Sequence, residues 1–271
     1  MRSLLLALLV VLPWRVGAAP RPVATADLAL GARVYQTECA RCHGVAADGA
    51  GREARALEPR PCNFTAGVFK FRTTPSGRPP ATADVLRTIG HGLAGTGMPS
   101  FASLTDDERH AVAAFVLRAA GLLDGDEPAP IPPAPSHPVV TAERLALGKS
   151  LYVDAGCPKC HGAAGKPDAD STKDLKNADG TPATAPDLTS AALPAGDTPI
   201  DVYYRIMTGV DGSPMASFEQ ALEGQDVWAL VDHVWSLRPT GRPAPPDALD
   251  DGPPMRTSRW CRGCHAATTA R

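Results

Sequence analysis

The stretch Cys39-Ala40-Arg41-Cys42-His43 has the pattern C-x-x-C-H, which occurs three times in this chain. The second copy is Cys157-Pro158-Lys159-Cys160-His161, and the third is Cys261-Arg262-Gly263-Cys264-His265. A single copy could also belong to a zinc site or a thiol redox centre. Three copies use six of the seven cysteines, so one shared role is favoured, the covalent attachment of haem.

In this attachment two thiols add to the vinyl groups of one haem, and the adjacent histidine binds the iron as its proximal ligand. The sequence therefore predicts three covalently bound haem c groups. The predicted attachment residues are Cys39, Cys42, Cys157, Cys160, Cys261 and Cys264, and the predicted proximal ligands are His43, His161 and His265.

Length and charge limit the other possibilities. With 271 residues the chain is long for one domain, which favours two. The formal net charge is −2 and there is no polybasic run, so nothing favours nucleic-acid binding.

Residues 1–18 have the features of a cleaved signal peptide. Arg2 precedes the apolar run Leu4 to Leu12, which is too short to span a bilayer, and Val16-Gly17-Ala18 offers small residues for cleavage. An uncleaved anchor is the alternative. No later stretch is long and apolar enough to cross a membrane, so we expect a periplasmic protein, which suits haem attachment outside the cytoplasm.

The chain contains a duplication with an offset of about 117 residues. Leu28, Gly31 and Tyr35 recur as Leu145, Gly148 and Tyr152, and the frame Gly92 to Phe101 around Met98 recurs as Gly209 to Phe218 around Met215. Each unit is predicted to hold an N-terminal helix, a haem site, a methionine loop and a C-terminal helix.

The helices carry start signals and apolar faces. Thr25 and Thr141 are plausible N-caps of the first helices, and Thr105 to Glu108 forms a capping box for the last helix of unit 1. We expect Gly31 and Gly148 to let the last helix of each unit pack closely against the first helix. Apolar residues at helical spacing are Val112, Phe115, Val116 and Ala119 in unit 1, and Val227, Leu230, Val231 and Val234 in unit 2. We expect the neighbouring Trp228 and Trp235 to be core residues.

No strand-like alternation stands out, so the predicted fold class is all-α with long loops. Six prolines in residues 128–138 favour an extended linker between the units. The expected organisation is a signal peptide at 1–18, domain 1 at 22–124, a Pro-rich linker at 125–139, domain 2 at 140–238, and an irregular Pro-rich tail with the third motif at 239–271.

The order helix, C-x-x-C-H, loop, methionine, helix resembles the class I c-type cytochromes over residues 22–124 and 140–238. In that family a loop methionine is the distal iron ligand, which the resemblance assigns to Met98 and Met215. Core filling is the alternative role for a lone methionine.

The family also has a Pro-x-Leu loop whose carbonyl accepts the proximal histidine N–H. Pro186-Asp187-Leu188 resembles this loop, whereas Pro61-Cys62-Asn63-Phe64 places Cys62 where Pro186 falls. The Cys62 carbonyl can still accept this bond, and we expect its thiol to be inert and partly buried.

A small basic and aromatic patch, Phe69-Lys70-Phe71-Arg72 with Arg78, occurs in unit 1 alone. We expect it to be a solvated loop. The alternative is a contact with haem propionates or an acidic partner.

Histidine and methionine together fill both axial positions of haem iron, which favours electron transfer over catalysis. The resemblance therefore implies a soluble carrier, or the cytochrome subunit of a respiratory complex peripheral to the membrane, that exchanges electrons with redox protein partners. The alternative is an enzyme similar to di-haem peroxidases or thiosulfate dehydrogenases, with one open distal site.

The third haem lacks a downstream methionine loop, because six residues follow His265. Met255 is the nearest candidate for its sixth ligand. His137 in the linker is another, His233 and His110 are weaker options, and an open site is also possible.

Overall fold

The computed structural model describes residues 25–194, 196 and 198–239. Helices and loops make up this part of the chain, and its one element of β pairing is an isolated bridge between Lys176 and Pro182. The predicted all-α class is confirmed. The predicted signal peptide and the third C-x-x-C-H motif lie outside the described residues.

Domain 1 begins with α1 (Thr25–Val34), which continues through a π-helical turn (Tyr35–Cys39) into the short α2 (Ala40–His43). Two 3₁₀ turns, Ala54–Ala56 and Phe64–Ala66, lie in the long loop that follows. The domain ends with α3 (Thr82–His91) and α4 (Asp106–Ala119).

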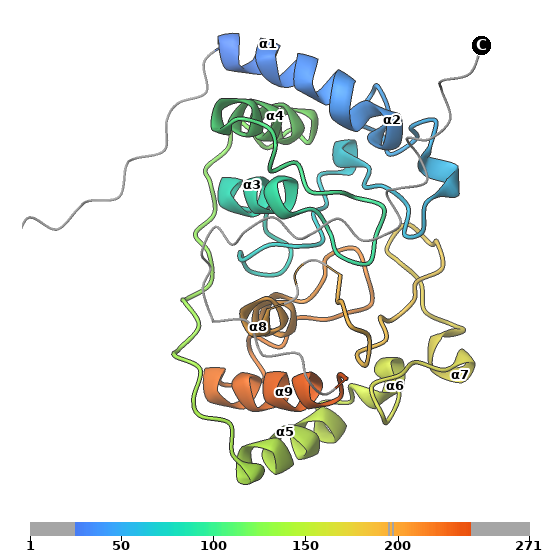
Figure 1. The fold of residues 1–271 in the computed structure, drawn as a ribbon, viewed down its shortest axis with the longest axis vertical. Coiled ribbons are helices and arrows are strands. Elements are labelled where there is room, and N and C mark those ends of the chain that lie inside the picture. Colours follow the sequence, from blue (N-terminus) through green and yellow to red (C-terminus); the bar gives the residue numbers. More distant parts are fainter. Residues whose placement is uncertain (1–24, 195, 197, 240–271) are drawn as a thin grey trace, which may run out of the picture.

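Domain 2 repeats this order with α5 (Ala142–Asp154), α6 (Pro158–His161), α7 (Ala169–Thr172), α8 (Pro199–Thr208) and α9 (Gly224–Ser236). Figure 1 shows the domains stacked, with α3 and α8 in the middle and α1 and α5 at opposite ends. An ion pair between Arg87 of α3 and Asp201 of α8 joins the two domains at this level.

The first and last helices of each domain pack closely, α1 on α4 and α5 on α9. A Cβ atom on Gly31 would overlap the carbonyl group of Ala111, and one on Gly148 would overlap that of Ala229. Both glycines are needed because the backbone of the facing helix occupies the space of a side chain. The predicted close approach is confirmed.

The predicted caps also form at the described side chains. Thr105 accepts a hydrogen bond from the Glu108 N–H at 3.3 Å, and the Glu108 carboxylate accepts one from the Thr105 N–H at 2.8 Å. Thr141 accepts from the Arg144 N–H at 3.3 Å. Thr25 is the first residue of α1, and its side chain is outside the description.

The predicted core positions lie inside the two domains. Val112, Val116, Val227, Leu230, Val231 and Val234 are buried, and Phe115 and Ala119 pack against the core of domain 1. Trp228 is fully buried, with Trp235 partly buried beside it. These residues bury the apolar faces on which the helix pairs close.

The helices α3 and α8, which precede the methionine loops, were not predicted from the sequence. Both have an aspartate at the third helical position: Asp84 accepts a hydrogen bond from the Ala81 N–H and Asp201 from the Thr198 N–H. In α8 a proline also occupies the first helical position. These are start signals that the sequence carried.

The Pro-rich linker is extended and bound to both domains. The Ile131 N–H donates to the Thr73 carbonyl at 2.7 Å, and the Trp228 indole N–H donates to the Pro135 carbonyl at 2.7 Å. The His137 ring stacks on Trp228 with a centroid separation of 4.2 Å, and its Nε2 lies 2.6 Å from an Asp232 carboxylate oxygen. The linker is thus a packed part of the fold.

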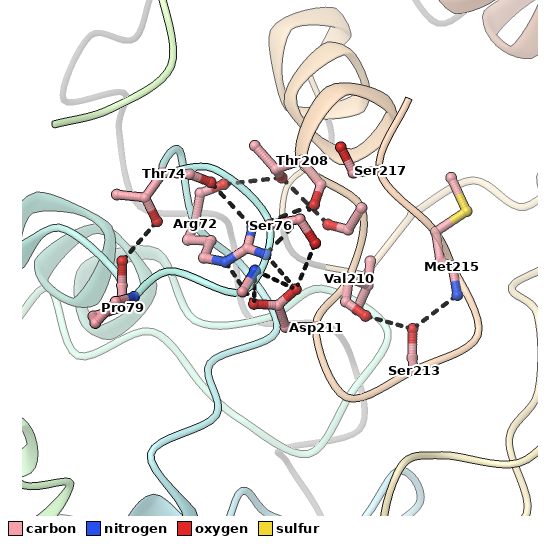
Figure 2. Close-up of polar contacts among 12 residues, drawn as sticks. Arg72, Thr74, Ser76, Pro79, Thr208, Val210, Asp211, Ser213, Met215 and Ser217 are labelled. Carbon is pink, nitrogen blue, oxygen red and sulfur yellow. Dashed lines mark hydrogen bonds and ion pairs between the residues drawn. The ribbon is translucent and has the colours of Figure 1, made fainter. Parts of the chain in front are cut away.

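The expectation of a solvated basic patch is wrong for Arg72, which is 1% exposed. Its Nε donates to the Asp211 carboxylate of domain 2 at 2.9 Å, and its Nη1 donates to the Thr208 carbonyl at 3.3 Å (Figure 2). A second ion pair joins Arg87 of α3 to Asp201 of α8. The patch departs from expectation because its acidic partner lies in the other half of the same chain.

Candidate functional site

The short helices α2 and α6 carry the first two C-x-x-C-H motifs, and equivalent tyrosines fix the turn after each. The Tyr35 hydroxyl donates to the Gly44 carbonyl, and the Tyr152 hydroxyl donates to the Gly162 carbonyl, both at 2.8 Å. Gly44 and Gly162 have φ of 83° and 72°, a region that glycine adopts readily. These bonds hold the end of each motif against its N-terminal helix.

A backbone carbonyl orients the imidazole of each motif. His43 Nδ1 lies 3.0 Å from the Cys62 carbonyl oxygen, and His161 Nδ1 lies 3.3 Å from that of Pro186. A carbonyl oxygen only accepts hydrogen bonds, so Nδ1 carries the proton and Nε2 keeps a free lone pair. The expected bond to Cys62 is confirmed, and both imidazoles have the tautomer that binds a metal through Nε2.

The two methionine loops have the same hydrogen-bond pattern. The Met98 carbonyl accepts from the Leu93 N–H and the Met215 carbonyl from the Val210 N–H, both at 3.0 Å. Hydroxyl groups of Thr96 and Ser213 accept from the Met98 and Met215 N–H groups, at 3.1 and 3.2 Å. Figure 2 shows the second of these contacts beside the interface. The loop is thus a repeated structural unit that holds each methionine in the same way.

One cavity of about 660 Å³ connects these parts. Its lining is mostly apolar and comes from both domains. It includes both C-x-x-C-H motifs and both loop methionines: Cys39, Cys42, His43, Met98, Cys157, Cys160, His161 and Met215. The structure therefore brings together all eight predicted site residues that lie within its described part.

Burial shifts the pKa values of this set. It raises the pKa of the Cys39 thiol to about 11 and also raises that of Cys157. It lowers the pKa of His43 and His161, partly opposed by their backbone hydrogen bonds. Both imidazoles are neutral near pH 7, as a metal ligand must be.

Comparison with known proteins gives a consistent result. The family model "Cytochrome C oxidase, cbb3-type, subunit III" matches residues 26–116, and the model "Cytochrome c" matches residues 145–238. A chain of the reducing HAO-like protein complex of Kuenenia stuttgartiensis is 36% identical, with a TM-score of 0.73. That alignment covers 78% of this chain and 96% of the other. No curated protein sequence gives a significant match.

The chain belongs to the c-type cytochromes. Its two family matches lie in tandem and correspond to the two helical domains described above. As a protein of this family the cytochrome is expected to transport electrons, and its domains imply covalently bound haem c.

The cavity of the cytochrome fits such a group. In each domain two thiols and one imidazole with a free Nε2 face the same apolar space, and a thioether borders it. This donor set provides covalent attachment together with nitrogen and sulfur ligands for iron. An apolar lining also limits the access of water, which is one way in which proteins set the reduction potential of bound iron.

The described histidines that were candidates for the sixth ligand of the third haem have other contacts. His233 is buried and packs edge-on against Tyr152, and His110 is exposed on α4. His137 would have to break its contacts with Trp228 and Asp232 to serve another site. Met255, Cys261, Cys264 and His265 lie outside the described residues, so the ligands of a third haem stay predictions.

Proposed function

We propose that this cytochrome holds three haem c groups and transfers electrons between redox proteins of the periplasm. In this proposal Cys39 with Cys42, Cys157 with Cys160 and Cys261 with Cys264 form the thioether bonds. His43, His161 and His265 are the proximal ligands, and Met98 and Met215 are distal ligands in the two domains.

The observation that carries the proposal is the shared cavity, which both motif helices and both methionine loops border. When bound, each haem supplies a one-electron couple at its iron. The protein residues would hold two such groups in one apolar space, and an imidazole together with a thioether as iron ligands would leave no open coordination position. This arrangement favours electron transfer over substrate chemistry.

We further propose that the cytochrome works as a subunit or partner of a larger redox complex. The similarity to a chain of the reducing HAO-like protein complex supports this proposal. None of the helices in the described ranges is both long and apolar enough to cross a membrane. In this proposal the predicted signal peptide exports the chain, so its partner would lie on the same side of the membrane.

An enzymatic role is the second candidate, because the similar chain comes from a complex described as HAO-like and the third haem has no assigned sixth ligand. Carbon monoxide separates the two functions. We expect the haems of domains 1 and 2 in the reduced protein to resist carbon monoxide. A rapid Soret shift equivalent to a full haem in either domain would contradict the electron-transfer proposal.

Intact mass spectrometry of the protein from its native host tests the cofactor content. We expect the mature chain to exceed its polypeptide mass by three haems. An excess of two would show that the terminal motif is unused. Truncation before Pro253 should leave the spectra of domains 1 and 2 intact and slow electron transfer to the co-purifying partner, and unchanged rates would mean that the third haem is dispensable.

A further inference from the structure

Arg205 of α8 carries buried donors without a described acceptor. Its Nε and Nη1 atoms are shielded from solvent and have no hydrogen-bond partner among the described residues. Its guanidinium carbon lies 4.8 Å from the centre of the Phe71 ring of domain 1, so it sits at the junction of the domains. Burial lowers its pKa to about 10, which leaves it charged near neutral pH.

The carboxylates near this junction already have other partners. Asp211 binds Arg72, and Asp201 binds Arg87 and the Thr198 N–H. Asp84 accepts hydrogen bonds from the N–H groups of Thr73 and Ala81. Unlike Arg72 and Arg87, Arg205 has no carboxylate bonded to it in the described part of the chain. A buried charge without hydrogen bonds is strongly unfavourable, so a missing partner is expected.

Arg205 lines the shared cavity. Nε and Nη1 lie on different edges of the guanidinium plane, so each needs its own acceptor. Acidic oxygen atoms of a group bound in the cavity would provide these acceptors. Haem has two propionate carboxylates, and arginine is well suited to bind a carboxylate. The duplicated position in domain 1 is Thr88, which carries no charge, so this feature is specific to domain 2.

We propose that Arg205 binds the two propionate carboxylates of a haem in the shared cavity, one through Nε and the other through Nη1. The proposal rests on the proposed function, since it requires haem in that cavity. The cation compensates the propionate charge and favours the reduced form of the iron, which carries one positive charge fewer. Arg205 thereby raises the reduction potential of the haem that it contacts.

The test is a redox titration of the haem-loaded protein with Arg205→Met and Arg205→Lys. For Arg205→Met we expect the reduction potential of one haem to fall by at least about 59 mV. For one electron this corresponds to a tenfold change in the equilibrium constant of reduction. Arg205→Lys should retain most of the wild-type value, because it keeps the charge. Repeating the titration with Met98→Ala and with Met215→Ala identifies which haem shifts.

Arg238→Met is the matched control. Arg238 is also a buried arginine of domain 2, but it donates to the carbonyls of Ser190 and Ala191 and does not line the cavity. We expect this variant to keep all the wild-type potentials, even if its melting temperature falls.

Two measurements distinguish the possible failures. A chain whose mass shows no haem in domains 1 and 2 overturns the proposed function and this inference together. Loaded haems with unchanged potentials in Arg205→Met overturn this inference alone. A crystal structure of the haem-loaded protein is the second measurement, and should place a propionate oxygen within about 3.2 Å of Nε or Nη1. Water in the adjacent small cavity of about 40 Å³ as the only new partner would overturn the inference.

Discussion

Cys62 and Pro186 occupy equivalent places in the two domains, and each directs its backbone carbonyl to the Nδ1 atom of the histidine in its own domain. The two side chains have little in common, so the orienting group is the main chain. Burial raises the pKa of the Cys62 thiol, which keeps it protonated and weakly reactive. A residue that looked like a departure from the family pattern therefore preserves its function.

At the same scale we predict that Met98→Ala and Met215→Ala each remove about half of the weak thioether-to-iron band at the red end of the oxidised spectrum. Each variant should also lower one reduction potential and make one haem reactive with carbon monoxide, because a thioether ligand raises the potential and closes the sixth position. Visible spectroscopy and redox titration measure these changes. Met207→Ala is the control, because Met207 packs in the core of domain 2 and does not line the cavity. Retention of the full band in either loop variant would show that the substituted methionine is not a distal ligand.

At the scale of the elements, two helix pairs carry the fold, and each depends on one glycine. Gly31 meets the carbonyl group of Ala111 and Gly148 that of Ala229, so even a methyl group forces the helices apart. The tyrosines that bind the end of each haem motif are close to these glycines in the chain. Tyr152 lies on α5, the helix that contains Gly148, and Tyr35 lies in the π turn that follows α1. Helix packing and site geometry are therefore coupled.

We predict that Gly31→Ala and Gly148→Ala lower the free energy of unfolding by about 1–3 kcal/mol each, because overpacking displaces the facing backbone. Gly90→Ala in α3 is the matched control, since its Cβ would meet no atom within 4 Å. That control should be neutral or more stable by about 0.5–1 kcal/mol, the usual helical preference for alanine. Chemical denaturation of the three variants measures the effect, and equal stabilities would contradict the proposed role of the two glycines.

His233 on α9 predicts a pH dependence for the pair α5 and α9. Burial, and then the nearby Lys149 cation, lower its pKa in the folded protein below the ordinary 6.5. The unfolded chain then binds the proton more readily, so stability is lost as the pH falls below 6.5, by at most about 1.4 kcal/mol per pH unit.

The measurement is denaturation of wild type and His233→Gln across this range of pH. The variant should show a shallower loss of stability on acidification, whatever its stability at neutral pH. His110→Gln, which changes an exposed histidine on α4, is the control variant. An unchanged slope in His233→Gln would show that another group causes the acid sensitivity.

At the scale of the whole molecule, the loop of domain 1 that contains Arg72 docks on domain 2. The Asp211 carboxylate accepts hydrogen bonds from Arg72, from the Ser76 hydroxyl and from the Gly77 N–H (Figure 2). The linker adds further contacts, since Ile131 donates to Thr73 of this same loop and Pro135 accepts from Trp228 of domain 2. These contacts hold the two halves of the cavity together.

We predict that Asp211→Asn destabilises the protein by about 3 kcal/mol, because it leaves the buried Arg72 cation without its partner. The double variant Arg72→Met with Asp211→Asn should recover part of this loss, since it removes the buried cation that Asp211→Asn leaves unpaired. Calorimetry should also show whether the domains then unfold separately.

Asp124→Asn is the control for Asp211→Asn. It removes the exposed pair of Asp124 with Arg118 at 4.0 Å and should cost less than about 1 kcal/mol. Equal stability losses in Asp211→Asn and Asp124→Asn would contradict a structural role for the buried ion pair.

The sequence by itself determined the features that depend on local spacing and on the duplication. The C-x-x-C-H motifs, the cap at Thr105 and the methionine loops could be predicted because neighbouring residues contain all the required information. Gly31 and Gly148 could also be interpreted, since helical periodicity places them on a packed face. The helices α3 and α8 were missed, although Asp84 and Asp201 marked their starts.

Only the tertiary structure decided how the two domains meet. Arg72 and Asp211 are 139 residues apart, and no local pattern distinguishes a charge that finds a partner across an interface from one that is solvated. For the same reason the sequence did not reveal the cavity shared by the two domains or the buried position of Arg205, because burial depends on which surfaces come together. Local order thus follows from short-range chemistry, whereas the junction between the domains depends on long-range packing.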